Sequence, residues 1–292
     1  MLSATSARSS ESPVSPISRW LGRIIRRELR RFDTERGLSA AQRAQLRAEL
    51  QATQRFQDDK RLLKFEHQVF SQGGEDGAIR EIFRRIGTET RRFVEFGVGD
   101  GLENNTLFLL QQDWSGVWIE GNEANAAAIR SKFQRIIAEG RLTFIGARVT
   151  TDNALELLPA RARAQPFDLL SIDLDRNTFA IWQSLRTLRP RAIVIEYNAV
   201  WPADFSHAVP YSADATWNGS SHFGASLKAI ERQGRATDYS LVGCDAAGTN
   251  AFLVRNDLLG DHFRDPFTAE NHYEPIRYFL HGKDGYRREI AD

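Results

Sequence analysis

Residues Phe93–Gly101 read FVEFGVGDG, an apolar run of strand character that passes into a glycine-rich turn. Val and Phe favour a half-buried strand. Three glycines at alternate positions suit a tight turn where the backbone approaches a ligand closely. Because a helical pattern follows over Leu102–Gln111, the stretch predicts the strand–turn–helix unit at which doubly wound α/β folds hold nucleotide-like ligands.

The same alternation of short apolar runs and amphipathic segments continues along the chain. The strand candidates are rich in Val, Ile, Leu and Phe, and they are Arg92–Phe96, Gly116–Glu120, Leu142–Ile145, Phe167–Ile172 and Ala192–Tyr197. The helical candidates between them are Leu102–Gln111, Glu123–Glu139, Thr151–Ala164 and Thr178–Leu185. This order predicts a parallel sheet with right-handed crossover connections.

A different pattern follows the fifth strand candidate. After an irregular segment, Ala199–His222, a helix is expected near Gly224–Gln233, followed by strands at Tyr239–Cys244 and Ala251–Arg255. The short link between these two strands predicts an antiparallel hairpin. We therefore expect an α/β fold, with a Rossmann-like, seven-stranded, mostly parallel sheet and a C-terminal antiparallel hairpin. This element order is similar to that of class I methyltransferases.

The N-terminal region differs in composition from the rest. Residues 1–16 are rich in Ser and Pro and predict a disordered tail. Residues 17–68 predict a helical arm, with helices over Ile17–Phe32 and Ser39–Phe65, and residues 69–292 form the expected main domain. Residues 1–50 carry a net charge of +5, although the whole chain carries only +1. This basic arm suits packing on the domain, on a second subunit of a homodimer, or on a membrane surface or an anionic glycan.

Bulk composition limits the class of protein. Hydrophobic residues make up 41% and charged residues 26% of the 292 residues, as is typical of a globular chain. No run reaches the roughly 18 consecutive apolar residues of a membrane span, and the N-terminus lacks the apolar core of a secretory signal. Cys244 is the only cysteine, so no intramolecular disulfide can form. Together these features favour a cytoplasmic protein.

The glycine spacing and its preceding acid indicate which cofactor the turn holds. Gly97, Gly99 and Gly101 form a G-x-G-x-G pattern, whereas dinucleotide folds carry G-x-G-x-x-G. Glu95, which precedes the turn, would repel a pyrophosphate but suits the cationic amino group of a methionine moiety. Both details favour S-adenosylmethionine over NAD.

Further polar residues lie where the rest of that cofactor would bind. Glu120 ends the next strand, nineteen residues after Gly101. An acid at this place can accept hydrogen bonds from both ribose hydroxyls. Asn122, on the loop behind it, and Asp152, after the third strand, are candidates for contact with the adenine.

Motifs around the turn resemble those of one methyltransferase family. Phe70–Gly77 reads FSQGGEDG and resembles the Ser-Gln-x-Gly-Glu-Asp signature of FkbM-like methyltransferases. Asn104–Thr106 is similar to that family's Ser-Asn-Thr segment, and Trp114–Glu120 to its Gly-Trp-x-Gly-x-x-Ile-Glu stretch. The resemblance covers roughly residues 70 to 255, and it implies methylation of a hydroxyl, often on a sugar or a natural product. The residues that it places close to the cofactor are Gln72, Glu75 and Asn105.

The chain departs from this family at two places. Ser171–Asp175 reads SIDLD, where much of the family has Asp-x-Glu-Gly. Glu95–Gly97 reads EFG rather than Asp-Ile-Gly. These departures indicate a side branch with a different acceptor.

Polar residues end two neighbouring strands of the expected sheet. Asp173 and Asp175 follow the fourth strand, while Glu196 and Asn198 follow the fifth. Carboxyl ends of adjacent parallel strands meet at one edge, and carboxylate and amide oxygens are the ligands that Mg²⁺ prefers. Asp173, Glu196 and Asn198 resemble the ligand set of metal-dependent O-methyltransferases, where the metal lowers the pKa of the attacking hydroxyl. In the alternative reading, Asp173 contacts the cofactor and Glu196 hydrogen-bonds the backbone.

Without a metal, a side chain must accept the hydroxyl proton. The candidates are His222 and His207, in the irregular segment, and Asp175. A histidine near its ordinary pKa suits general-base catalysis at neutral pH. The same segment holds aromatic side chains that suit stacking on a sugar ring, namely Trp201, Tyr211 and Trp217.

We therefore expect an S-adenosylmethionine-dependent O-methyltransferase that acts on a hydroxylated small molecule, a sugar or a natural product, with or without Mg²⁺. One alternative is a non-catalytic S-adenosylmethionine- or nucleotide-binding module recruited through the basic arm. Another is a nucleic-acid methyltransferase. Against nucleic acid stand the missing Asn/Asp-Pro-Pro-Tyr motif after the fourth strand and a slightly acidic main domain.

Overall fold

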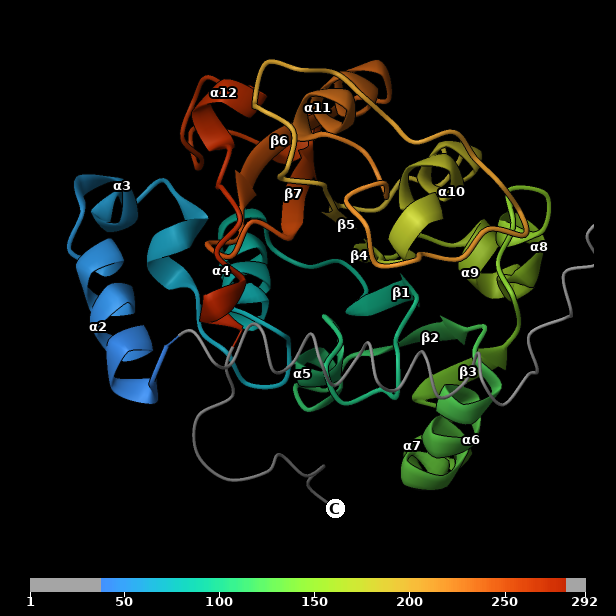
Figure 1. The fold of residues 1–292 in the computed structure, drawn as a ribbon. Helices are drawn as coiled ribbons and strands as arrows, with labels where there is room; N and C mark the ends of the chain where they lie inside the picture. The colour runs from blue at the N-terminus through green and yellow to red at the C-terminus, as the bar shows by residue number, and fades with distance from the viewer. Residues whose placement is uncertain (1–37, 282–292) are drawn as a thin grey trace, which may run out of the picture.

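The computed structural model describes residues 38–281 and places a seven-stranded sheet at its centre (Figure 1). The strands are β1 Arg92–Phe96, β2 Ser115–Glu120, β3 Leu142–Gly146, β4 Leu169–Ile172, β5 Ala192–Glu196, β6 Tyr239–Cys244 and β7 Asn250–Arg255. They are arranged in the order β3-β2-β1-β4-β5-β7-β6. Strands β1 to β5 pair in parallel, whereas β7 is antiparallel to both β5 and β6. This confirms the expected Rossmann-like sheet with its antiparallel hairpin.

Helices cover both faces of the sheet. Those of the main domain are α4 Glu75–Ile86, α5 Leu107–Leu110, α6 Glu123–Lys132, α7 Gln134–Ala138, α8 Ala154–Leu157, α9 Ala160–Ala164, α10 Thr178–Ser184, α11 Leu227–Ala236 and α12 Ala269–His272. Because successive side chains of a strand point to opposite faces, Val94 and Phe96 pack with α8, α10 and α11, while Phe93 packs with α4, α5, α6 and α7. Strands β1, β2, β4 and β5 are therefore mostly buried on both faces, whereas the edge strand β3 is partly exposed.

Several predicted helices are shorter or interrupted. The segment expected as one helix over Thr151–Ala164 breaks at Pro159, because the residue before a proline avoids the helical conformation. The segment over Glu123–Glu139 changes course at Phe133 and forms α6 and α7. Helix α5 begins only at Leu107, since the Asn104 side chain accepts from the amides of Thr106 and Leu107.

The arm is helical where the structure describes it. Ser39 caps α2 (Ala40–Gln51) through a reciprocal capping box with Gln42. The expected helix over Ser39–Phe65 is interrupted, because α3 covers only Gln54–Gln57 and a 3₁₀ turn, η1, covers Leu62–Phe65. Figure 1 shows α2 and α3 at one side of the molecule, beyond α4. The predicted tail and the helix over Ile17–Phe32 lie outside the described residues.

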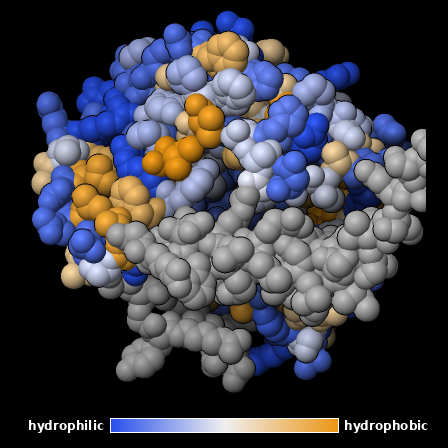
Figure 2. Space-filling view, in the orientation of Figure 1, coloured by the Kyte–Doolittle hydropathy of each residue, from blue (hydrophilic) through white to orange (hydrophobic). Residues whose placement is uncertain are grey.

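The surface in view is mostly hydrophilic, with apolar side chains gathered in small groups, one of them over the α2–α3 region (Figure 2). Within residues 38–281, no helix has the length and apolar character needed to cross a bilayer.

Candidate functional site

The glycine turn after β1 has three glycines in the left-handed region, and each meets a different environment. A Cβ on Gly97 would lie 1.7 Å from the carbonyl oxygen of Asp173, so this glycine lets the ends of β1 and β4 approach each other. A Cβ on Gly101 would lie 2.7 Å from the ring of Phe133. A Cβ on Gly99, by contrast, would have nothing within 4 Å. The turn is therefore tightly packed at both ends and open at its middle.

Glu120, at the end of β2, holds this turn. Its Oε2 accepts from the amide of Gly99 at 2.9 Å, and its Oε1 accepts from the amide of Asn122 at 2.7 Å. Burial raises the pKa of Glu120. Asn122 itself caps α6, because its side-chain oxygen accepts from the amides of Ala124 and Asn125. The Asn125 side chain and the Gly121 amide also interact with this carboxylate, so a ligand's hydroxyl groups would compete with these partners for its acceptor positions.

Glu95 of β1 is buried, and its hydrogen bonds join β1 to β4 and to the segment before α5. Its carboxylate accepts from the amide of Asn105 at 3.0 Å, from the hydroxyl of Ser171 at 2.9 Å and from the hydroxyl of Thr106. Burial raises its pKa to about 7. These contacts bind the start of α5 to β1 and β4. Contact of Glu95 with a methionine amino group stays a prediction.

The motif at Phe70–Gly77 forms the loop that leads into α4. One carboxylate oxygen of Asp76 accepts from three successive amides and a hydroxyl, those of Val69, Phe70, Ser71 and the Ser71 side chain. Glu75 accepts from the amide of Gly73 at 2.7 Å and from the side-chain amide of Asn250 at 3.0 Å. Gln72 is exposed on this loop. The contacts of Asp76 therefore stabilise the loop internally, and the contact of Glu75 with Asn250 joins the start of α4 to the start of β7.

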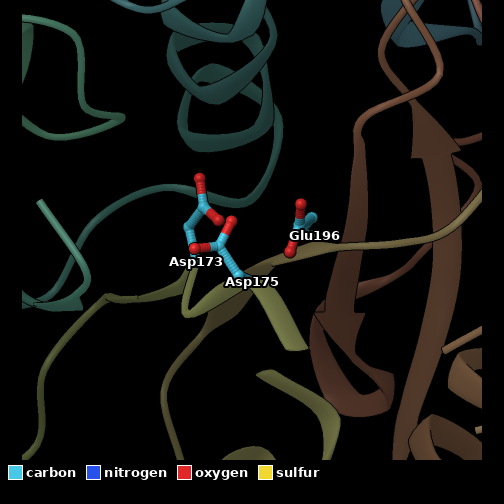
Figure 3. A group of neighbouring side chains, drawn as sticks. All are labelled: Asp173, Asp175 and Glu196. Carbon is cyan, nitrogen blue, oxygen red and sulfur yellow. The ribbon is translucent and has the colours of Figure 1, made fainter. Parts of the chain in front are cut away.

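Three carboxylates gather where β4 and β5 end (Figure 3). One oxygen each from Asp173, Asp175 and Glu196 lies within 4.8 Å of the others. Burial and the neighbouring negative charges raise the pKa of Asp173 to about 7 and that of Glu196 well above its usual range. Desolvation also raises the pKa of Asp175, although its side chain reaches the surface. Such a group repels itself unless a cation or protons neutralise it.

Asn198 lies beside these acids in sequence but its side chain is used elsewhere. Its amide group donates to the carbonyls of Ser221 and Phe223 at 2.8 and 3.0 Å, and its oxygen accepts from the amide of Val200 at 3.1 Å. Asn198 therefore anchors the irregular segment that follows β5. The third carboxylate that the fold brings to Asp173 and Glu196 is that of Asp175, and a ligand role for Asn198 stays a prediction.

The irregular segment Ala199–His222 runs along this edge of the sheet. The hydroxyl of Tyr211 accepts from the amide of Thr151 at 3.2 Å, next to the exposed Asp152 beyond β3. His207 packs on Trp201, with 4.6 Å between ring centroids, and its backbone amide donates to Ser226. His222 is exposed.

The structure adds residues that the sequence did not point to. Asn250 begins β7 directly opposite Glu196. The ring of His281 packs on Tyr278 at 5.4 Å between centroids, and its Nε2 lies 3.1 Å from the hydroxyl of Thr249. The antiparallel return of β7 brings Asn250 to the acidic edge, and the much later segment that ends at His281 contacts Thr249 just before β7. Both contacts join distant parts of the chain, so no local pattern could have identified them.

Comparison with known proteins gives no family assignment. No family model and no curated protein matches the chain. Solved structures give weak likenesses. The O-methyltransferase TomG from Streptomyces achromogenes, solved with S-adenosylmethionine, is 15% identical over 72% of this chain and 96% of its own, with a TM-score of 0.43.

Two other solved structures show similarly low sequence identity and TM-scores. The glycopeptide N-methyltransferase MtfA is 15% identical over 62% of this chain and 88% of its own, with a TM-score of 0.37. The METTL16 methyltransferase domain is 11% identical over 62% and 66%, with a TM-score of 0.38. All three TM-scores lie below 0.5, so the fold assignment rests on the strand order, and any function must be argued from the site.

Proposed function

We propose that the chain is an S-adenosylmethionine-dependent O-methyltransferase of a FkbM-like side branch. The observation that carries this proposal is the pairing of Glu120 with the glycine turn, where Gly99 opens onto free space at the carboxyl ends of the strands. In an open α/β sheet, ligands bind at this edge. An acid here offers acceptors to a ribose, and no positive side chain on the turn invites a phosphate.

The charge of the neighbouring edge supports a cationic cofactor. Asp173, Asp175 and Glu196 lie within a few ångströms of one another, and none forms an ion pair with a Lys or Arg of the described residues. S-adenosylmethionine carries a sulfonium and an ammonium group, both positive. Glu120 would hold the ribose of the cofactor, and these acids would offer negative charge to its cationic groups.

The acceptor is proposed to be a hydroxylated small molecule, a sugar or a natural product. The segment Ala199–His222 borders the edge and carries partly exposed rings, among them Tyr211 and Trp217. Bound S-adenosylmethionine would supply the methyl group for displacement by an acceptor oxygen, so the main task of the protein would be positioning. His207, His222 or Asp175 would receive the hydroxyl proton if no metal assists. A bound Mg²⁺ would supply charge that lowers the pKa of that hydroxyl.

The remaining parts of the proposal concern the chain as a whole. We assign catalysis to residues 69–292 and dimer contacts or docking to the arm, residues 17–68. A single cysteine, Cys244, is consistent with a reducing compartment such as the cytoplasm.

Methyl transfer tests the proposal. The full chain is incubated with methyl-labelled S-adenosylmethionine and panels of sugars, phenols and polyketide alcohols, with Mg²⁺ or with EDTA. The proposal predicts a labelled methyl ether and S-adenosylhomocysteine in equal amounts. Tight cofactor binding without turnover of any acceptor would favour the non-catalytic binding module instead, and labelled nucleic acid would favour the third reading.

A further inference from the structure

Asn250 carries a buried oxygen that lacks a partner. The side chain is 4% exposed, and its amide group donates to Glu75 at 3.0 Å. Its Oδ1 makes no hydrogen bond with any described residue. Leaving such an acceptor unsatisfied destabilises the fold, because the buried oxygen has lost its hydrogen bonds to water. A buried oxygen of this kind points to a ligand that the protein itself does not provide.

The register of β5 and β7 places this oxygen beside the acidic group. Asn250 is the direct partner of Glu196 in the antiparallel ladder. The next pair along, Tyr197 and Thr249, is joined by a backbone hydrogen bond of 2.8 Å. Glu196 and Asn250 therefore form a non-hydrogen-bonded pair, in which the two side chains share one face and lie closest together.

We propose that Asp173, Asp175, Glu196 and the side-chain oxygen of Asn250 form a site for one divalent cation. Three carboxylates and an amide oxygen are hard ligands of the type that Mg²⁺ and Mn²⁺ take, with water or substrate oxygens completing the shell. The ion neutralises the clustered charge and satisfies the unpaired oxygen. Asn250, and not Asn198, supplies the amide, because the nitrogen and the oxygen of the Asn198 side chain already have hydrogen-bond partners in the irregular segment, whereas the oxygen of Asn250 has none. Only the catalytic use of this ion rests on the proposed methyltransferase function.

Binding of Mn²⁺ alone tests the site. Free Mn²⁺ is counted by electron paramagnetic resonance as it is titrated into the full chain after EDTA treatment, with no cofactor present. The proposal predicts one ion per chain. Changing even an outer partner of a metal ligand costs about 10–100-fold in affinity, so Glu196→Gln, Asp175→Asn and Asn250→Ala should each weaken Mn²⁺ at least about tenfold.

Matched variants control for charge and for the strand. Asp204→Asn makes the same charge change as Glu196→Gln at an exposed acid, and Asn256→Ala removes an exposed asparagine beyond the other end of β7. Both should bind Mn²⁺ as the wild type does. Asp175 is exposed, so its variant reports on the site even if Asn250→Ala fails to fold.

Two results would overturn the site: no stoichiometric Mn²⁺ in the wild type, or wild-type affinity in folded Asn250→Ala. Affinity for S-adenosylmethionine, measured in EDTA on the same samples, separates the two proposals. Cofactor binding without Mn²⁺ overturns the cation site alone, and Mn²⁺ binding without cofactor overturns the methyltransferase alone.

Discussion

Gly97 of the turn and Gly140, between α7 and β3, differ in what an added methyl group would meet. At Gly97 it would collide with the Asp173 carbonyl, whereas at Gly140, which has a similar positive φ of 73°, it would meet nothing within 4 Å. Both substitutions carry the left-handed strain of about 1–2 kcal/mol. We expect Gly97→Ala to lose several times more unfolding free energy than Gly140→Ala in urea titrations. Equal losses would show that the ends of β1 and β4 can separate without cost.

Glu95 should make stability depend on pH. Its folded pKa of about 7 lies above its ordinary value of 4.5, so between these values the folded chain holds more protons than the unfolded chain. This contribution therefore favours folding at pH 5 and is lost as the pH rises toward 7, at up to about 1.4 kcal/mol per pH unit. Unfolding free energies between pH 5 and 7.5 should fall more steeply for the wild type than for Glu95→Gln. Parallel slopes would contradict a protonated Glu95.

The sequence could predict which residues lie together where their contacts are made within or beside the glycine turn. Gly97, Gly99 and Glu120 lie together as the spacing indicated. Asn198 was placed at the acidic edge because the sequence shows where a strand ends but not what a side chain contacts. Asn250 was missed for the converse reason, since its approach to Glu196 depends on pairing between strands that lie 54 positions apart in the chain.

Among the structural elements, the loop before α4 owes its conformation largely to the hydrogen bonds that one carboxylate accepts. Asp76 receives three backbone amides and a hydroxyl on a single oxygen. Asp76→Ala would leave these buried donors unpaired, and we expect a loss of at least about 3 kcal/mol in unfolding free energy. Asp214, whose side chain is fully exposed, serves as the control, and Asp214→Ala should change stability little. A mild effect at Asp76 would mean that water replaces the carboxylate.

The strands were predicted more closely than the helices. Runs of Val, Ile, Leu and Phe place all seven strands within two residues of their observed ends, because burial on both faces of a sheet demands such runs. Helix ends depend on caps and breaks. Pro159 divides one predicted helix, and α4 was not predicted because its first turn reads as a motif rich in glycine and acid.

At the scale of the whole molecule, part of the arm belongs to the core. Leu62 of η1 is 1% exposed, and a Cβ on Gly243 of β6 would lie 3.1 Å from it. Leu62→Ala should cost about 2–5 kcal/mol, as truncation of a buried leucine does. Val200→Ala, at a side chain that is 48% exposed, should cost far less. If both variants unfold at the same denaturant concentration, η1 is dispensable for the fold.

We expect the glycine turn and Glu120 to bind S-adenosylmethionine. Isothermal titration of the full chain with S-adenosylmethionine and S-adenosylhomocysteine tests this most directly. Glu120→Ala and the isosteric Glu120→Gln are compared with Glu123→Ala, a nearby exposed acid in the first turn of α6. We predict micromolar binding by the wild type and Glu123→Ala.

Loss of hydrogen bonds to a charged group should weaken both Glu120 variants by about 10–100-fold. Circular dichroism verifies that each variant is folded. No binding of either compound by the wild type, or unchanged affinity in a folded Glu120 variant, would show that the turn and Glu120 do not bind the cofactor.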